Sequence, residues 1–224
     1  MNRVVYAACD EKYYYDHAKH MAESAARFGE KVYIDVIDPV NKIQSSNENI
    51  IVNNCAVRPP PSVDKRTLYA CFRFLRAKDL LDTFDEMLIV DADGLFRSNV
   101  NWDYFKDADI SLFFRDPLPN TNEWETEGSR IAAGAVYTKK TALAYWEEVH
   151  DLIMSIGFMW FVDQYSLYAT YRRFDEKGAI KCIQMPKTYI DWEMNDDSII
   201  FTGKGDRKYT NETYLKEKVQ YENV

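Results

Sequence analysis

Apolar and polar positions along the first sixty residues follow two different periods. Residues 4–6 open an apolar run that ends at Asp10, and residues 31–37 and 50–57 form runs of the same kind. Between the first two runs, residues 17–28 carry Ala and Met at intervals of three and four, and a glycine follows, which predicts a helix with one buried face. Strands that alternate with helices in this way favour an α/β domain with a parallel, doubly wound sheet.

The same alternation continues beyond a break at Pro59–Pro61, three prolines that fit neither a helix nor a central strand. Residues 67–81 carry apolar positions along one side and predict a helix. Residues 87–90 are entirely apolar, as in a parallel strand that is buried on both faces. The remaining predicted elements are strands over residues 110–114 and 131–137, a polar loop over residues 117–128, and helices over residues 139–154 and 161–174.

The chain shows no repeat, no low-complexity segment and no long linker. Its 224 residues suit one α/β domain, which we expect over residues 1–208, followed by a polar C-terminal tail over residues 209–224. Hydrophobic residues make up 46% of the chain, enough for a substantial core, so wholesale disorder is excluded.

Charge and cysteine content narrow the class of protein further. Lys and Arg number 28 against 36 Asp and Glu, a net charge of −8, which argues against binding nucleic acid through its phosphates. The four cysteines are far apart and form no CxxC pair, so a zinc site or a disulfide framework is not expected. The N-terminus lacks a signal-like apolar stretch, and no apolar run approaches the roughly 18 residues that span a bilayer. We therefore expect a cytoplasmic protein without a transmembrane segment.

The strongest chemical signal is Asp91-Ala92-Asp93, which follows the apolar strand over residues 87–90. Ligands of open α/β sheets bind outside the carboxyl ends of the strands. In an extended strand, residues two apart project to one face, so both carboxylates could approach one ion. Two hard oxygen ligands suit Mg²⁺ or Mn²⁺ bound to a diphosphate. The alternative is a solvated strand end that simply favours Asp.

A second signal lies in residues 202–208, where glycines flank Lys204 and where Lys208 follows. A flexible backbone with nearby cations is what a phosphate-binding turn requires. The alternative is an ordinary basic surface loop.

Two helical positions add weaker signals. Arg73 stands among aromatic residues on an otherwise buried helix and needs an anionic partner, either a structural Asp or a ligand. Asp163 and Gln164 stand at the start of a predicted helix, where they could cap the helix or bind sugar hydroxyls.

Taken in this order, these segments resemble the GT-A glycosyltransferases, most closely the family-8-like retaining group that includes glycogenin and bacterial galactosyltransferases. The resemblance covers residues 4–208 and implies a single Rossmann-like, nucleotide-diphospho-sugar transferase domain with a mostly parallel central sheet. It implies metal ligands at Asp91, Asp93 and Thr202, and catalytic roles for Asp163, Gln164 and Lys208. The donor-binding residues that it implies are Ala7, Asp10, Tyr13, Arg73, Asp91, Ala92, Asp93, Gly134, Ala135, Lys204, Gly205 and Lys208.

The sequence departs from the family pattern at two positions. Thr202 stands where the family has a metal-binding His, so either water or a nearby carboxylate, Asp196 or Asp197, completes the metal shell, or metal affinity is low. Ala133 replaces the Asn that contacts the donor sugar, which leaves the identity of that sugar open.

The resemblance implies a metal-dependent enzyme that moves a hexose from a nucleotide-diphosphate sugar, expected to be a UDP-sugar, to an acceptor hydroxyl with retention of configuration. The acceptor could be a glycan, a protein or a small molecule. Two alternatives stay open. One is a haloacid-dehalogenase-type phosphatase that uses Asp91 and Asp93, although that motif normally opens the first strand of its core. The other is a nucleotide-sugar-binding module without turnover.

Overall fold

The computed structural model describes residues 1–57, 63–119 and 122–221, so the predicted break at Pro59–Pro61 lies outside the described residues. Its main sheet has seven strands and is mostly parallel, which confirms the predicted α/β class. In hydrogen-bonded order the strands are β3 (Ile50–Cys55), β2 (Val32–Ile37), β1 (Arg3–Asp10), β4 (Glu86–Val90), β7 (Ile131–Lys139), β6 (Ile110–Phe114) and β8 (Cys182–Gln184). The chain divides into two compact units, which are described separately.

The first unit comprises residues 1–3, 63–89, 102–119 and 122–185 of the described chain. Strand β4 is buried along its whole length, as its apolar sequence predicts. Strand β6 pairs antiparallel with β7 and parallel with β8. The helices and helical turns of this unit are α3 (Lys65–Leu75), α4 (Ala77–Leu80), η2 (Trp102–Phe105), α5 (Glu123–Gly128), η3 (Lys140–Ala142), α6 (Leu143–Ile156) and α7 (Val162–Glu176).

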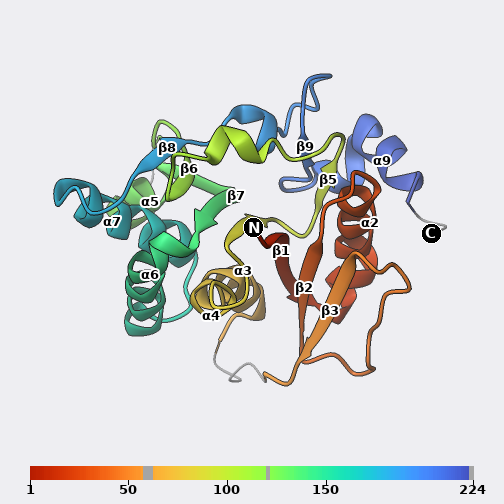
Figure 1. The fold of residues 1–224 in the computed structure, drawn as a ribbon, viewed down its shortest axis with the longest axis horizontal. Helices are drawn as coiled ribbons and strands as arrows, with labels where there is room; N and C mark the ends of the chain where they lie inside the picture. Colours follow the sequence, from red (N-terminus) through yellow and green to blue (C-terminus); the bar gives the residue numbers. More distant parts are fainter. Residues whose placement is uncertain (58–62, 120–121, 222–224) are drawn as a thin grey trace. The chain divides into compact units, whose positions relative to one another are not determined.

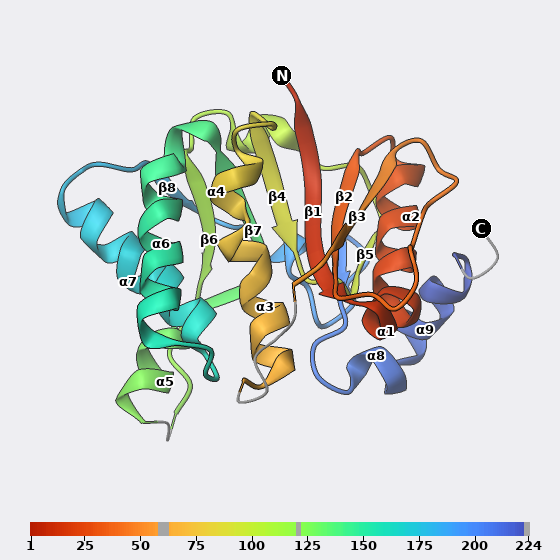
Figure 2. The same cartoon turned by 90° about the horizontal axis from the view of Figure 1, so that it is seen from below.

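Packing within the first unit follows from its apolar faces. The helix expected over residues 67–81 is interrupted at Arg76, which separates α3 from α4. Figure 2 shows α3, α4 and α6 side by side, and stacked rings of Phe74 and Trp146, with centroids 6.0 Å apart, join α3 to α6. The polar stretch over residues 117–128 contains helix α5, which we had expected to be loop throughout.

The second unit comprises residues 4–57, 90–101 and 186–221 of the described chain. Strands β1, β2 and β3 pair in parallel, and α2 lies beside them in Figure 1. A separate two-stranded sheet pairs β5 (Gly94–Phe96) antiparallel with β9 (Ile200–Thr202). The helices of this unit are α1 (Glu11–Tyr13), the π-helix η1 (Tyr14–Ala18), α2 (Lys19–Arg27), η4 (Lys187–Tyr189), α8 (Arg207–Thr210) and α9 (Glu212–Val219).

The segment expected as a polar C-terminal tail contains helix α9. Tyr214 of this helix is completely buried and packs with Leu95, Met194 and Phe201. Figure 2 shows α8 and α9 beside α1, so residues from both ends of the sequence meet in this unit. The tail prediction missed this helix because one buried aromatic residue in a polar segment gives almost no periodic signal.

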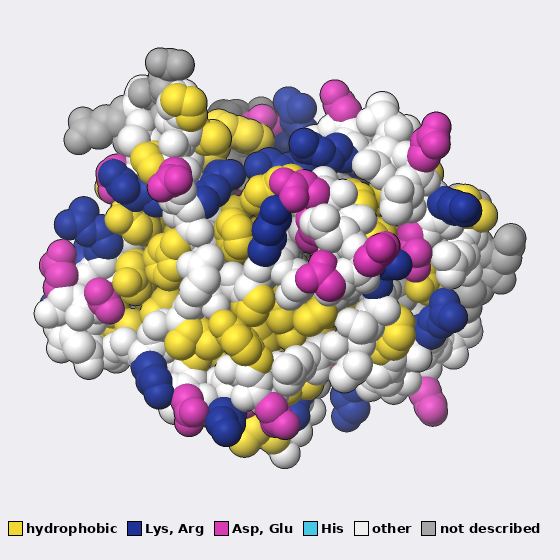
Figure 3. All heavy atoms as spheres, turned by 90° about the horizontal axis from the view of Figure 1, so that it is seen from above, with side chains coloured by type: hydrophobic (Ala, Val, Ile, Leu, Met, Phe, Trp, Pro, Cys, Tyr) yellow, Lys and Arg dark blue, Asp and Glu magenta, His cyan; other side chains and the backbone are white. Residues whose placement is uncertain are grey.

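Two surface properties bear on function. None of the helices described here is both long enough and apolar enough to span a bilayer. On the face drawn in Figure 3, Lys and Arg side chains are interspersed with Asp and Glu side chains.

Candidate functional site

The two aspartates of the Asp91-Ala92-Asp93 segment lie in a tight turn. Strand β4 ends at Val90, and the Gly94 amide donates a hydrogen bond to the Asp91 carbonyl oxygen over 3.0 Å. The assumption of an extended strand through these residues was therefore wrong. The chain turns here because Gly94 begins β5, and a Cβ atom at Gly94 would lie 3.0 Å from Ile200 Cγ2 of the partner strand.

Asp93 is buried, with 5% of the residue exposed, and the two oxygens of its carboxylate have different surroundings. Oδ2 accepts hydrogen bonds from the Tyr13 hydroxyl over 2.7 Å and from Lys208 Nζ over 2.9 Å. Lys208 Nζ also donates to the Tyr13 oxygen over 2.8 Å. Oδ1 is buried and has no hydrogen-bond partner among the described residues. The two oxygens thus differ, since Oδ2 is held by the protein and Oδ1 is a candidate ligand-binding atom.

Tyr13, Tyr214 and Asp10 together fix the position of Asp93 and of its hydrogen-bond donor. Burial, followed by the charge of Asp93, raises the pKa of Tyr13 far above its usual value, so its hydroxyl remains a donor at neutral pH. The buried Tyr214 hydroxyl donates to the Asp93 carbonyl oxygen over 2.7 Å. The Asp10 side chain accepts from the Tyr13 amide over 2.6 Å and so caps α1. Asp10 therefore positions Tyr13. Tyr214 is a site residue that the sequence analysis did not identify.

Thr202 lies at the same end of the β5–β9 pair as Asp93. Its Cα pairs with Gly94, the residue after Asp93, and its amide donates to the Asp191 carbonyl oxygen over 2.7 Å. Thr202 is 3% exposed, and its Oγ1, like Oδ1 of Asp93, is buried without a hydrogen-bond partner in the described part of the chain. Buried polar atoms normally have partners, so each of these two oxygens is a candidate ligand-binding atom.

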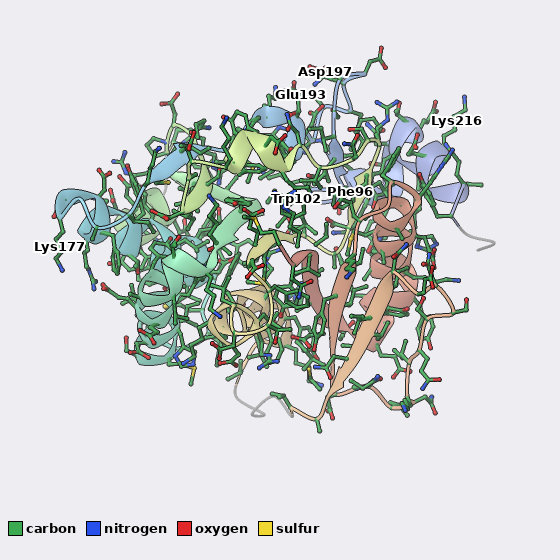
Figure 4. The ribbon with its side chains drawn as sticks, in the orientation of Figure 1. Phe96, Trp102, Lys177, Glu193, Asp197 and Lys216 are labelled. Atoms are coloured by element: carbon green, nitrogen blue, oxygen red, sulfur yellow. The ribbon has the colours of Figure 1, made fainter. Side chains whose placement is uncertain are left out.

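Neither Asp196 nor Asp197 adds a third acidic ligand. Across residues 1–57, 63–119 and 122–221, no three His, Cys, Asp or Glu side chains are grouped so as to hold a metal ion. Both aspartates are exposed, and Figure 4 shows Asp197 on the loop before β9. Asp191 organises this loop by accepting from the amides of Glu193 and Asn195 over 2.7 and 2.8 Å. Burial opposes ionisation of Asp191, but these bonds and one from Ser198 outweigh it and lower its pKa.

Gly203 and Gly205, which flank Lys204, are each required for a different structural reason. A Cβ atom at Gly203 would lie 2.8 Å from Lys208 Cβ, so only glycine allows β9 and α8 to approach this closely. Gly205 has φ +63°, a backbone conformation that favours glycine. Lys204 is exposed, and its Nζ lies 4.4 Å from the ring centroid of Trp192. The two lysines of the segment therefore differ, since Lys208 pairs with Asp93 and Lys204 lies over an aromatic ring.

Arg73 and Asp163 belong to the first unit. Arg73 is buried on α3 with its guanidinium 4.7 Å from the Phe74 ring centroid. Asp163 is buried in the first turn of α7, and burial, then the Asp163 charge, raises the pKa of the nearby Cys71 thiol. Both Asp163 and Arg73 act electrostatically on this thiol, so α3 and the start of α7 bring the two charges into one neighbourhood.

Gln164 lies beside Asp163 on α7 and has a partner that the sequence did not suggest. Its Oε1 accepts from Arg115 Nη2 over 3.4 Å, and Arg115 also donates to the Ser129 carbonyl oxygen over 2.7 Å. Of the remaining expected positions, Ala7 and Ala135 are completely buried in β1 and β7, Ala92 is buried in the Asp91 turn, and Gly134 is half-buried in β7.

Comparison with known proteins adds evidence from structure only. No family model matches the chain, and no curated protein sequence matches it. The solved structure of the galactosyltransferase LgtC, in complex with donor and acceptor sugar analogues, matches with a TM-score of 0.62 at 13% identity over 99% of this chain and 97% of that one. The chain has the GT-A glycosyltransferase fold. This confirms the fold that the sequence resemblance implies.

A second solved structure agrees with this assignment. A glycosyltransferase involved in the glycosylation of the major capsid of PBCV-1 matches with a TM-score of 0.57 at 12% identity over the full length of both chains. The GT-A fold differs from the phosphatase core that the alternative interpretation of Asp91 requires, so the phosphatase interpretation is set aside.

Proposed function

We propose that the protein is a glycosyltransferase that moves a hexose from a nucleotide-diphosphate sugar, with a UDP-sugar as the expected donor, to an acceptor hydroxyl with retention of configuration. The observation that carries this proposal is the divided carboxylate of Asp93, with Oδ2 held by Tyr13 and Lys208 and Oδ1 buried without a partner among the described residues. The GT-A fold supports it, because it is the fold of the two glycosyltransferases that match the chain.

The residues of the second unit fit a divalent cation, Mn²⁺ or Mg²⁺. Asp91, Oδ1 of Asp93 and Oγ1 of Thr202 would hold it, and hard oxygen ligands of this kind suit either ion. When bound, such an ion acts as a Lewis acid towards the charge that develops on a diphosphate leaving group. Thr202 contributes a neutral ligand in place of an imidazole, so we expect the protein alone to bind the ion weakly.

The chain's own charges would contribute to binding and to transfer. Lys208 and Lys204 supply ammonium groups that can donate charge-assisted hydrogen bonds to a diphosphate. Each such donor can lower the barrier by about 2–4 kcal/mol, because it strengthens as negative charge develops. Asp163 and Gln164 would hold the sugar hydroxyls in position.

The test is transfer from a UDP-sugar with Mn²⁺ present, measured for the wild type and for Asp93→Ala. We expect a loss in kcat of about 100-fold or more, since the variant removes the centre of the charged cluster. Asp196→Ala is the matched control, because it deletes an exposed aspartate of the same unit. If folded Asp93→Ala turns over as fast as the wild type, the site is wrong. Nucleotide binding without any donor consumption by the wild type would instead indicate a binding module.

A further inference from the structure

Lys208 already compensates the charge of Asp93 in the free protein. The Lys208 Nζ and Asp93 Oδ2 atoms are 2.9 Å apart, and the two side chains are 16% and 7% exposed. A carboxylate buried to this extent is costly unless a positive charge or hydrogen-bond donors surround it. Lys208 and the Tyr13 hydroxyl supply both at the same oxygen.

This arrangement conflicts with strong binding of a second cation. A divalent ion on Oδ1 of Asp93 would share one carboxylate with the ammonium group on Oδ2. Like charges at such separations repel strongly where water is excluded, and each weakens the binding of the other. Lys208 must therefore lower the affinity of the protein alone for the ion.

We propose that Lys208 is a built-in competitor for the divalent cation and that it makes the binding of the cation depend on the nucleoside diphosphate. This inference rests on the proposed function. In the free protein Lys208 holds Asp93. A bound diphosphate offers the Lys208 ammonium a second anionic partner, and as Lys208 turns towards it, Asp93 becomes available as a metal ligand. Because coupling between two ligands is reciprocal, the cation then strengthens nucleotide binding by the same factor.

The local structure allows Lys208 to change partners. In the described structure its Nζ donates hydrogen bonds to Asp93 and Tyr13 and lies 5.8 Å from the Tyr209 ring centroid, and its four-carbon stem is flexible. It belongs to the short helix α8, whose other residues, Arg207, Tyr209 and Thr210, are exposed.

Lys204 provides a matched comparison within the same segment. It carries the same charge four residues away, and its Nζ lies 4.4 Å from the centroid of the Trp192 ring. If any nearby positive charge weakened Mn²⁺ binding, replacing either lysine would raise the Mn²⁺ affinity equally. If the Lys208–Asp93 ion pair is responsible, only the replacement of Lys208 would raise it.

The experiment is a calorimetric titration of the full chain with MnCl₂ in the absence of any nucleotide. We expect Lys208→Met to bind Mn²⁺ about tenfold more tightly than the wild type, the size of a one-unit pKa shift caused by a single neighbouring charge. Lys204→Met should stay within about twofold of the wild type. With UDP at saturation, the gain in Mn²⁺ affinity should be about tenfold smaller for Lys208→Met than for the wild type.

Several results would overturn the proposal. They are Mn²⁺ binding by Lys208→Met no tighter than by the wild type, an equal gain in both lysine variants, or no Mn²⁺ binding by any of them at about 10 mM. If Lys208→Met does not fold, Lys208→Gln, which keeps a hydrogen-bond donor, provides the same test. The titration uses neither donor sugar nor turnover. A transferase could fail it while still consuming a UDP-sugar, and a binding module could pass it, so the two proposals can fail separately.

Discussion

The candidate residues of the two units differ in whether local structure alone explains why they are there. Tyr13, Asp93 and Lys208 of the second unit come together across separations of 80 and 115 residues and form one buried, charged cluster. Asp163 of the first unit stands in the first turn of α7, where an acidic residue also stabilises a helix through its dipole. A cluster of charges gathered from distant segments is costly to bury and needs a function to explain it. An aspartate at the start of a helix needs no such explanation. The second unit therefore carries the stronger evidence for a functional site.

Replacing Asp163 can break this comparison, and among the substitutions that test the comparison it has the largest expected effect. If Asp163 positions the donor sugar, Asp163→Asn should lower kcat about 100-fold, by analogy with the loss of one well-oriented group. If it serves only the helix, the free energy of unfolding should fall by about 0.3–1 kcal/mol and activity should be unchanged. Steady-state transfer assays and urea denaturation of the same preparations separate the two outcomes.

Asp175→Asn serves as the control for this substitution. Asp175 lies on the same helix, is exposed and carries the same charge. If the two variants transfer sugar at the same rate, Asp163 has no role beyond α7, and the comparison between the units becomes sharper.

Tyr214 tests how firmly the second unit holds Asp93. The Tyr214→Phe substitution removes the 2.7 Å hydrogen bond to the Asp93 carbonyl oxygen and leaves that buried acceptor without this donor. We expect the free energy of unfolding to fall by about 2 kcal/mol, the usual cost of an unsatisfied buried polar group. Tyr209 is 57% exposed as a residue, and Tyr209→Phe should change the free energy of unfolding by less than about 0.5 kcal/mol. Equal losses in urea denaturation would show that Tyr214 contributes no more than an exposed tyrosine.

The elements of the fold were predictable where the signal is local. The structure confirms the strand predicted at residues 87–90 and the helix that ends at Gly29. Burial on two faces requires a run of apolar residues, and a positive φ favours glycine, so both features can be recognised in the sequence. Helix α5 had a signal that we did not use: the Asn122 side chain accepts from the Glu125 amide over 2.8 Å and caps the helix. This is a short-range rule, and applying it to residues 117–128 would have predicted that helix.

The details of the site could not be predicted in the same way. The Asp91-Ala92-Asp93 motif is visible in the sequence, but its turn arises because β5 pairs with β9, more than a hundred residues later. The two Asp93 carboxylate oxygens differ because Tyr13 and Lys208 both donate to Oδ2. No local sequence pattern indicates which oxygen a distant side chain contacts. The contribution of Tyr214 follows from the packing of α9, whose sequence is mostly polar.

The smallest expected effect comes from His17, which packs against the same cluster. His17 is 1% exposed as a residue, and its ring centroid lies 4.6 Å from that of Tyr13. Burial, then the charges of Lys218 and Lys208, lowers the pKa of His17 to about 4 against the opposing effect of Asp93. In the unfolded chain a histidine titrates near 6.5. As the pH falls from about 6.5 to 4, the unfolded state therefore takes up a proton that the folded state does not, and stability is lost.

The His17→Gln substitution should remove this part of the pH dependence. Between pH 7 and 4 we expect the wild type to lose about 1–2 kcal/mol more unfolding free energy than the variant, a value reduced for residual solvent screening. Urea denaturation across this range measures the difference, and His150→Gln in the first unit controls for the loss of a histidine as such. Parallel curves for wild type and His17→Gln would mean that water reaches His17. The ring cluster beside Tyr13 would then be too open to keep the Asp93–Lys208 pair dry, and the competition proposed for Lys208 would lose its electrostatic basis.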